Sequence, residues 1–311
     1  MENKLTEQEK FDKLVECAEK YIEINAMHIL NKLRQQESKS CSELIEGTYK
    51  PMIEDINQVN DDDFKETVIK RMCIQLQNYQ RMPQALDYAS YSYHPEEDNG
   101  DNIDSCSENN EIFQYTYKKI TGNVETTQEE IYEQFSKYYD EKVYKHGKYN
   151  ITLKKYSKGL ADFIEKTRND KNYFETIKND CNELDKLAQD GKIKEIEKIL
   201  NKFSKGIYYL KTALSYDFFK ELFCKNLVKP DIHIKEIFKR YIYENRKLPN
   251  DNQIACDFIN MCKRLNKTPY YIDKIFWLCC TGQFYEDGII INKMTRRNFF
   301  KLVDFNFTQR R

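Results

Sequence analysis

The sequence predicts an all-helical protein. Its 311 residues include only 9 Gly and 6 Pro, which leaves few residues for turns. Apolar residues recur every three to four positions over long stretches, which is the spacing of one buried helix face. Hydrophobic residues make up 40% of the chain, with 18 Phe and 23 Tyr, enough to build a core. No strand pattern and no internal repeat is evident.

The helical spacing extends along most of the chain. A long helix is predicted over 4–35, where Leu14, Ala18 and Ile22 share one face, and another over 62–80. Further helices are predicted over 128–145, 156–167, 172–189, 192–202, 210–224, 232–245, 251–265, 270–281 and 294–303.

An acidic segment divides the helical pattern. Residues 94–111, HPEEDNGDNIDSCSENNE, are rich in Asp, Glu and Asn and nearly free of large apolar side chains. Such a composition cannot bury enough apolar surface to fold, so it predicts a flexible loop. We therefore expect an N-terminal helical region over 1–93, an acidic flexible loop over 94–111 and a helical domain over 112–311.

Several classes of protein are excluded. No run approaches the roughly 18 apolar residues that span a bilayer, and the charged N-terminus is unlike a signal peptide, so we expect no membrane association. The 10 cysteines are scattered through helical pattern, which favours reduced thiols and an intracellular location, cytoplasmic or nuclear. We interpret them as packing residues rather than metal ligands, and expect no cofactor.

Charge is distributed unevenly. Residues 141–311 hold 35 Lys and Arg against 22 Asp and Glu, whereas residues 1–140 hold 15 against 29. The basic half is the half that a polyanion would approach. The alternative is that lysines simply cover solvated helix faces, because a bias along the sequence does not show a patch in space.

One segment carries a specific motif. Over 205–238, Gly206 precedes Lys211 at the start of one predicted helix, and Asp231 follows Pro230 in the N-cap position of the next. Lys211 and Asp231 are separated by twenty residues. The order G-x4-K-T-A followed by K-P-D-x-H resembles the hairpin, catalytic lysine and catalytic aspartate of the helix-hairpin-helix (HhH-GPD) DNA glycosylases, similar to 8-oxoguanine glycosylase and endonuclease III.

The resemblance implies a two-lobed helical fold with an extra N-terminal region, double-stranded DNA as partner, and base excision as activity. Asp231 would stabilise the cationic sugar electrostatically. Lys211, if partly desolvated by its apolar neighbours, would attack C1′, form a Schiff base and permit cleavage of the strand at an abasic site. Such an enzyme would act in base excision repair, as a hydrolase and a lyase.

The resemblance also implies which residues contact DNA. Hairpin amides of the family hold a phosphate, which points to Gly206 and Lys205, and His233 would donate to a phosphate as well. Tyr208 and Tyr209 could donate hydroxyls or stack on a base. Phe276 and Trp277 fall where the family places a helix bordering the base pocket.

The chain departs from the family at two places. Three residues, Tyr208, Tyr209 and Leu210, stand where the family has a second glycine and one further residue, so the hairpin is longer and lacks a glycine that lets backbone approach a phosphate. The C-terminal cysteines, C-x5-C-x16-C-C, do not match the iron–sulfur loop of some glycosylases.

Other interpretations remain open. Asp231 could be only an N-cap, Lys211 a solvated lysine, and Phe276 and Trp277 core residues. The chain could be a catalytically inactive glycosylase-fold protein that binds DNA or acts as a scaffold. It could also be a helical protein-interaction module, with an unknown partner for its acidic N-terminal half. If the glycosylase interpretation holds, Lys211 and Asp231 should face a common groove.

Overall fold

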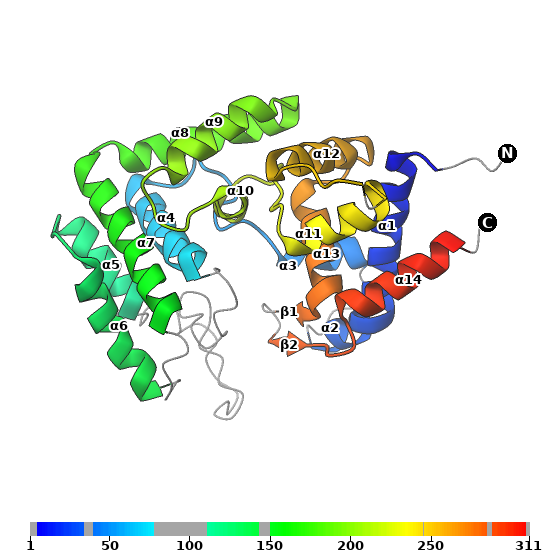
Figure 1. Cartoon of the computed structure of the whole chain (residues 1–311), viewed down its shortest axis with the longest axis horizontal. Coiled ribbons are helices and arrows are strands. Elements are labelled where there is room, and N and C mark those ends of the chain that lie inside the picture. Colours follow the sequence, from blue (N-terminus) through cyan, green and yellow to red (C-terminus); the bar gives the residue numbers. More distant parts are fainter. Residues whose placement is uncertain are drawn as a thin grey trace. The chain divides into compact units, whose positions relative to one another are not determined.

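The computed structural model describes residues 5–33, 40–77, 111–142, 150–244, 246–284 and 288–308, and this part of the chain is predominantly helical (Figure 1). The all-helical prediction is therefore confirmed. The chain forms two compact units. Unit 1 comprises Met1–Pro51, Asp185–Ile196 and Cys224–Arg311, and unit 2 comprises Met52–Leu184 and Glu197–Phe223. The expected division into 1–93, 94–111 and 112–311 stays a prediction.

Unit 1 contains helices from both ends of the chain and one short hairpin of strands. Its elements are α1 (Glu7–Ile22), η1 (Glu23–Met27), α2 (His28–Leu33), α3 (Cys41–Thr48), α11 (Ile232–Ile237), η4 (Phe238–Ile242), α12 (Asp251–Arg264), α13 (Pro269–Thr281), β1 (Gln283–Phe284), β2 (Ile289–Ile290) and α14 (Arg296–Thr308). The segments η1 and η4 are π-helical turns.

The core of unit 1 forms around α1. Thr6 and Glu9 make a reciprocal capping box that starts this helix. Helix α1 packs against α13 and α14, and the ring of Phe11 is completely buried. Its centroid lies 5.5 Å from that of Phe258 and 6.1 Å from those of Phe238 and Phe276, in edge-to-face arrangements. The first helix of the chain therefore completes the core made by the last third.

Unit 2 is a helical bundle. Its elements are α4 (Asp61–Gln77), α5 (Glu111–Thr121), α6 (Gln128–Lys142), α7 (Asn150–Asn169) and α10 (Thr212–Leu222), while α8 (Tyr173–Asp190) and α9 (Ile193–Ser204) contribute residues to both units. Helix α4 packs against α5, α7 and α10. Arg71 on α4 forms a buried ion pair with Asp217 on α10, with a nitrogen–oxygen distance of 3.1 Å.

Most predicted helices are present, with three differences. The helix predicted over 4–35 runs from Glu7 to Leu33 but contains the π-helical turn η1. Helices α3 and α5 were not predicted, because each is short and offers few repeats of the apolar spacing. Gln283 pairs with Ile290 and Phe284 with Ile289 in an antiparallel ladder that was also not predicted, since two residues are too few to show alternation.

Two further predictions concern the acidic loop and membrane-spanning helices. Residues 94–110 of the expected acidic loop lie outside the described residues, and Glu111 begins α5. Within the described part of the chain, every helix is too short or too polar to cross a lipid bilayer.

We predict that Phe11→Ala lowers the free energy of unfolding of unit 1 by about 3–5 kcal/mol, because it leaves a cavity among three aromatic rings. The control is Phe305→Ala on α14, where the native side chain is 57% exposed and the loss should stay within about 0.5 kcal/mol. Urea unfolding followed by fluorescence of Trp277, the single tryptophan, measures both. Equal losses would contradict the described core.

Candidate functional site

The first part of the motif forms a helical hairpin between α9 and α10. Helix α9 ends at Ser204, and Lys211 is the N-cap residue of α10. The backbone of Gly206 has φ +84°, and that of Tyr209 has φ +69°. Both values lie in the left-handed region, which glycine adopts without strain and tyrosine does not. Ile207 and Leu210 are buried, so two apolar side chains anchor the turn to the bundle.

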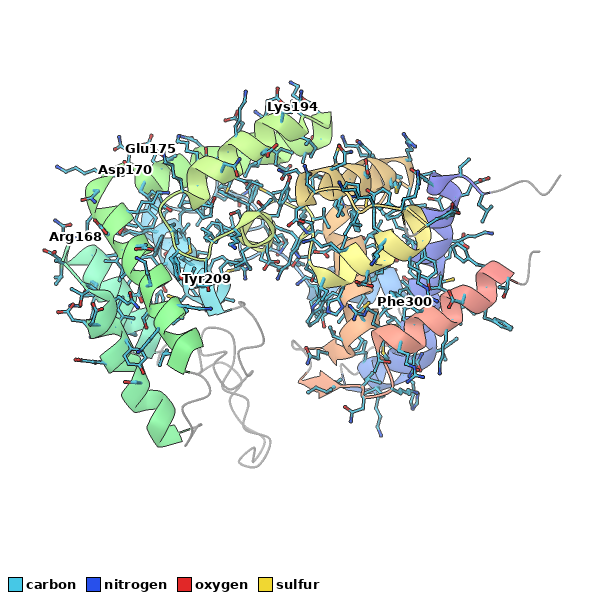
Figure 2. The ribbon with its side chains drawn as sticks, in the orientation of Figure 1. Arg168, Asp170, Glu175, Lys194, Tyr209 and Phe300 are labelled. Carbon is cyan, nitrogen blue, oxygen red and sulfur yellow. The ribbon has the colours of Figure 1, made fainter. Side chains whose placement is uncertain are left out.

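A lysine from α7 holds the end of α9. The ammonium group of Lys166 donates to the carbonyl oxygens of Phe203 at 2.7 Å, Lys205 at 3.0 Å and Lys202 at 3.4 Å. The last carbonyls of a helix have no partner within the helix and carry partial negative charge, so a cation there stabilises its end. Burial lowers the pKa of the Lys166 side chain, and the charge of Asp170, near the end of α7 in Figure 2, opposes this.

The two hairpin tyrosines lie beside lysines of α7. Tyr208 is 42% exposed and Tyr209, which Figure 2 labels, is half-buried; their ring centroids are 4.4 Å apart. The Nζ atom of Lys155 lies 5.0 Å from the centroid of the Tyr209 ring, and that of Lys158 lies 5.6 Å from the Tyr208 ring. Each of the two tyrosine rings is therefore paired with one lysine of α7.

Helix α7 also contacts the hairpin backbone directly. The N–H of Tyr208 donates to Oδ2 of Asp162 at 2.9 Å, and the other oxygen of that carboxylate pairs with Lys158 at 3.1 Å. At Gly159, a Cβ atom would lie 2.8 Å from the carbonyl oxygen of Tyr208. The close approach of helix and hairpin therefore requires glycine at this position.

Lys211 occupies the expected helix start. Its backbone carbonyl accepts the N–H of Ser215, which confirms the predicted start of the helix. The Lys211 side chain is exposed. Its neighbours Ile207 and Leu210, by contrast, are buried in the bundle.

Asp231 is the N-cap of α11 in unit 1. Its Oδ1 atom accepts hydrogen bonds from the backbone N–H groups of His233 at 2.8 Å and Ile234 at 3.0 Å. Both bonds use the same oxygen, so the carboxylate is oriented while Oδ2 takes no part in the cap. Lys211 belongs to unit 2, so the expectation of a common groove for these two residues stays a prediction.

His233, Lys229 and two residues distant in sequence, Cys280 and Arg296, make up the electrostatic surroundings of Asp231. Burial lowers the pKa of the half-buried His233, the charge of Asp231 raises it, and Arg296 and Lys229 lower it further. Nδ1 of His233 is buried without a hydrogen-bond partner in the described part of the chain. The pKa of the Cys280 thiol is raised by burial and by Asp231. A phosphate contact by His233 would thus come from a neutral imidazole at neutral pH.

The expected base-pocket residues lie on α13. The ring of Phe276 is completely buried and contacts Phe11, Phe258 and Phe299 in the core of unit 1, and its role at a base pocket stays a prediction. Trp277 is half-buried. Cys262, Cys279 and Cys280 are buried thiols of helix faces, and the described residues include no group of three His, Cys, Asp or Glu side chains placed to hold a metal.

The structure thus brings Gly206, Tyr208 and Tyr209 together on one turn, with the exposed Lys205 beside them. The sequence patterns did not predict the α7 residues that complete this surface, which are Lys155, Lys158, Asp162 and Lys166. They also did not predict Arg296, which lowers the pKa of His233. The three-residue spacing of Lys155 and Lys158, which places both on one face of a helix, was a signal that could have identified these two residues.

Comparison of the chain with protein families, with curated proteins and with solved structures found no match. The site is therefore interpreted from its own residues.

We predict that Gly159→Ala lowers the free energy of unfolding of unit 2 by about 1–3 kcal/mol, because the added methyl group would overlap a backbone oxygen that cannot move alone. Urea unfolding followed by far-ultraviolet circular dichroism measures it. The control is Gly47→Ala in α3, where a Cβ atom would meet nothing within 4 Å and the higher helix propensity of alanine should be neutral or stabilising. A Gly159 variant as stable as wild type would contradict the described hairpin contact.

A second prediction concerns pH. The pKa of His233 is lower in the folded protein than in the unfolded chain. Between these two pKa values the unfolded chain therefore binds more protons than the folded one. The free energy of unfolding thus decreases as the pH falls through this window. Wild type should therefore lose more thermal stability between about pH 7 and about pH 5 than His233→Asn does. Replacement of the exposed His28 by Asn is the control, and an identical loss in all three proteins would reject the described environment.

Proposed function

We propose that the chain is a DNA glycosylase of helix-hairpin-helix type that excises a modified or damaged base. The observation that carries the proposal is the order of its helix starts. A turn with left-handed Gly206 precedes Lys211 at the start of α10, and Asp231 follows at the start of α11. This order is the one expected from the family resemblance of the motif.

Asp231 would act on the sugar. When the N-glycosidic bond breaks, the base leaves with the bonding electrons and the sugar becomes an oxocarbenium-like cation. A fixed carboxylate stabilises that charge without reorganising. Two backbone N–H groups hold Oδ1 of Asp231, which supports a role in which Oδ2 faces the sugar.

Lys211 would act as the nucleophile. Its neutral amine adds to C1′ in place of the departed base and loses a proton, after which the C1′–O4′ bond breaks, O4′ takes up a proton and the open-chain sugar is held as a Schiff base. Removal of a proton from C2′ then breaks the C3′–O bond by β-elimination and releases the 3′-phosphate. The exposed position of Lys211 leaves it accessible to DNA. The proposal requires Lys211 and Asp231 to reach the same sugar carbon.

The hairpin would bind the DNA backbone through side chains more than through amides. Asp162 accepts the N–H of Tyr208, so this amide is already satisfied by a carboxylate and a phosphate would have to displace it. Lys155, Lys158 and Lys205 supply positive charge around the tyrosine pair, which can stack on an unpaired base.

The occupied amide of Tyr208 also favours a second candidate. A protein that kept the helical hairpin but not its phosphate-binding geometry would be a DNA-binding or scaffold protein without catalysis. The two candidates differ in their response to substitution of Asp231.

We predict that Asp231→Asn abolishes base release from duplexes that contain damaged bases, because it keeps the cap geometry but removes the charge that stabilises the sugar cation. Lys211→Gln should abolish borohydride trapping of a covalent protein–DNA adduct. Single-turnover excision assays over a panel of lesions, with gel analysis of trapped adducts, measure both effects.

DNA affinity is the control for these variants. Each should bind duplex DNA nearly as well as wild type, with an affinity that falls steeply with salt as phosphate contacts require. Lys194→Gln, on the solvated side of α9, should leave excision unchanged. If wild type releases no base from any lesion yet binds DNA, the DNA-binding candidate replaces the enzyme, and if it does neither, both are rejected.

A further inference from the structure

One face of α7 holds the backbone of the turn between α9 and α10. Gly159, Asp162 and Lys166 are three and four residues apart, so they share this face of the helix. Asp162 accepts the N–H of Tyr208 at 2.9 Å, and Lys166 donates to three carbonyl oxygens around the end of α9. At Gly159 the helix backbone approaches the carbonyl oxygen of Tyr208. The turn is therefore fixed by contacts on both its N–H and its carbonyl groups.

The N–H groups of the turn are largely used within the protein. Those of Lys205, Ile207, Leu210 and Lys211 donate to backbone carbonyl oxygens at distances between 2.8 and 3.3 Å. The N–H of Tyr208 is bonded to a carboxylate. A backbone turn binds a phosphate tightly through N–H groups that point at the phosphate. Contacts from this turn to a ligand therefore come chiefly from its side chains.

The carboxylate of Asp162 occupies the place that a phosphate oxygen would take. Its Oδ2 atom accepts the N–H of Tyr208, and its Oδ1 atom pairs with Lys158 at 3.1 Å. One N–H and one ammonium group are also what a phosphate would use. The negative charge of Asp162 repels a phosphate that approaches these donors. Because the bases of an intact duplex are paired and stacked, such a duplex presents mainly phosphates to the turn, and Asp162 disfavours it.

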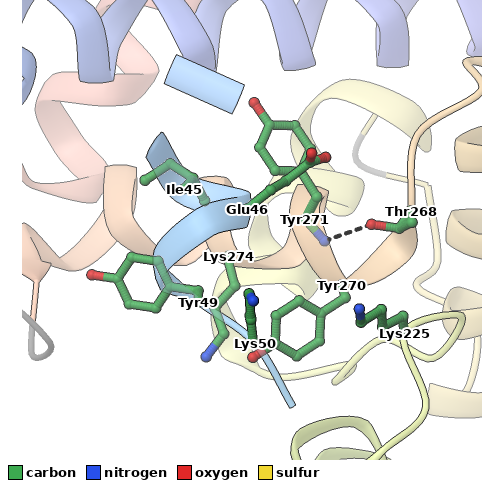
Figure 3. A pocket seen from close by; sticks show the side chains of 9 residues that line it. All are labelled: Ile45, Glu46, Tyr49, Lys50, Lys225, Thr268, Tyr270, Tyr271 and Lys274. Carbon is green, nitrogen blue, oxygen red and sulfur yellow. Dashed lines mark hydrogen bonds between the residues drawn. The ribbon is translucent and has the colours of Figure 1, made fainter. Parts of the chain in front are cut away.

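The turn presents an aromatic ring instead. Tyr208 is 42% exposed, and it is the only exposed tyrosine among those whose side chains the structure describes. A lysine beside a tyrosine does not by itself mark a ligand site. In the pocket of unit 1 shown in Figure 3, Lys274 lies 5.3 Å from the ring centroid of Tyr270, but that tyrosine is only 5% exposed and belongs to the packed interior. The ring of Tyr208, by contrast, is accessible to a ligand.

Positive charge lies next to this ring. The Nζ atom of Lys158 is 5.6 Å from the centroid of the Tyr208 ring, and the Lys158 side chain is 45% exposed. An ammonium group has three N–H donors, so Lys158 can contact a phosphate while it pairs with Asp162. Lys205, three residues before Tyr208, is also exposed. An accessible ring beside cations is the combination that binds a strand at an unpaired base.

We propose that Asp162 and Tyr208 make the hairpin select DNA with unpaired bases over an intact duplex. Tyr208 stacks on the unpaired base, and Lys158 and Lys205 contact neighbouring phosphates. Asp162 keeps the N–H of Tyr208 from a duplex phosphate, so it determines specificity without touching the base. The inference rests on the proposed function, since it names the class of DNA that the hairpin of the same site takes.

Fluorescence anisotropy of the full chain at one salt concentration tests the role of Tyr208. The probes are a labelled duplex and the same duplex with a bubble of unpaired thymines. Wild type should bind the bubble about tenfold more tightly, and Tyr208→Leu should lose most of this preference through weaker bubble binding, because it removes base stacking. The matched control, Phe305→Leu, removes another exposed aromatic ring and should bind both DNAs like wild type.

A second pair of variants tests Asp162. Asp162→Ala should strengthen duplex binding about fivefold or more relative to bubble binding, because it frees the N–H of Tyr208 for a phosphate. Glu165→Ala removes an equal charge from an exposed position of α7. It should strengthen binding of both DNAs equally and leave their ratio unchanged. Since Tyr208→Leu alters an exposed side chain and keeps its backbone N–H, it tests the inference even if Asp162→Ala does not fold.

Equal affinity of wild type for the two DNAs overturns the inference, as does an equal loss of preference in Phe305→Leu and Tyr208→Leu. The same ratio of affinities in Asp162→Ala and Glu165→Ala overturns the role of Asp162. Base release is measured on lesion-bearing versions of the same DNAs. Excision without a preference for the bubble overturns this inference alone. A preference that depends on Tyr208, without any excision, overturns the enzyme and supports the inference.

Discussion

The buried ion pair between Arg71 and Asp217 fixes the helix on which the candidate nucleophile depends. Both side chains are 6% exposed, and Lys220 adds a second contact to Asp217 at 3.4 Å. Removal of one member of such a pair leaves an uncompensated charge, which typically costs about 3–5 kcal/mol. Helix α10 is therefore held in one register against α4, and the position of its N-cap residue, Lys211, depends on contacts made by Asp217 further along the helix.

The carboxylate of Asp231 is positioned by a different kind of constraint. Its partners lie two and three residues ahead in the chain, so its orientation is local and does not depend on distant packing. The two groups are thus positioned separately. Tertiary contacts within unit 2 position the start of the helix at Lys211, and a helix cap within unit 1 orients the carboxylate of Asp231.

Local features of the site could be predicted from the sequence, and tertiary ones could not. The helix starts at Lys211 and Asp231 follow from capping preference and apolar spacing, which act over a few residues. By contrast, Asp162 reaches Tyr208 across 46 residues of sequence, and no periodicity encodes that contact. Phe276 shows the same limit, because apolar spacing marks a buried face but does not separate core from pocket.

Tyr209 has a consequence for the balance between folding and surface chemistry. A tyrosine with positive φ is strained by an amount of order 1 kcal/mol or more, and glycine would relieve it. Folding alone would therefore favour glycine here, whereas the chain presents an aromatic ring beside Lys155. The hairpin therefore forgoes some stability by carrying a tyrosine at this position, and Tyr209→Gly would be expected to stabilise the turn while it removes the ring that Lys155 contacts.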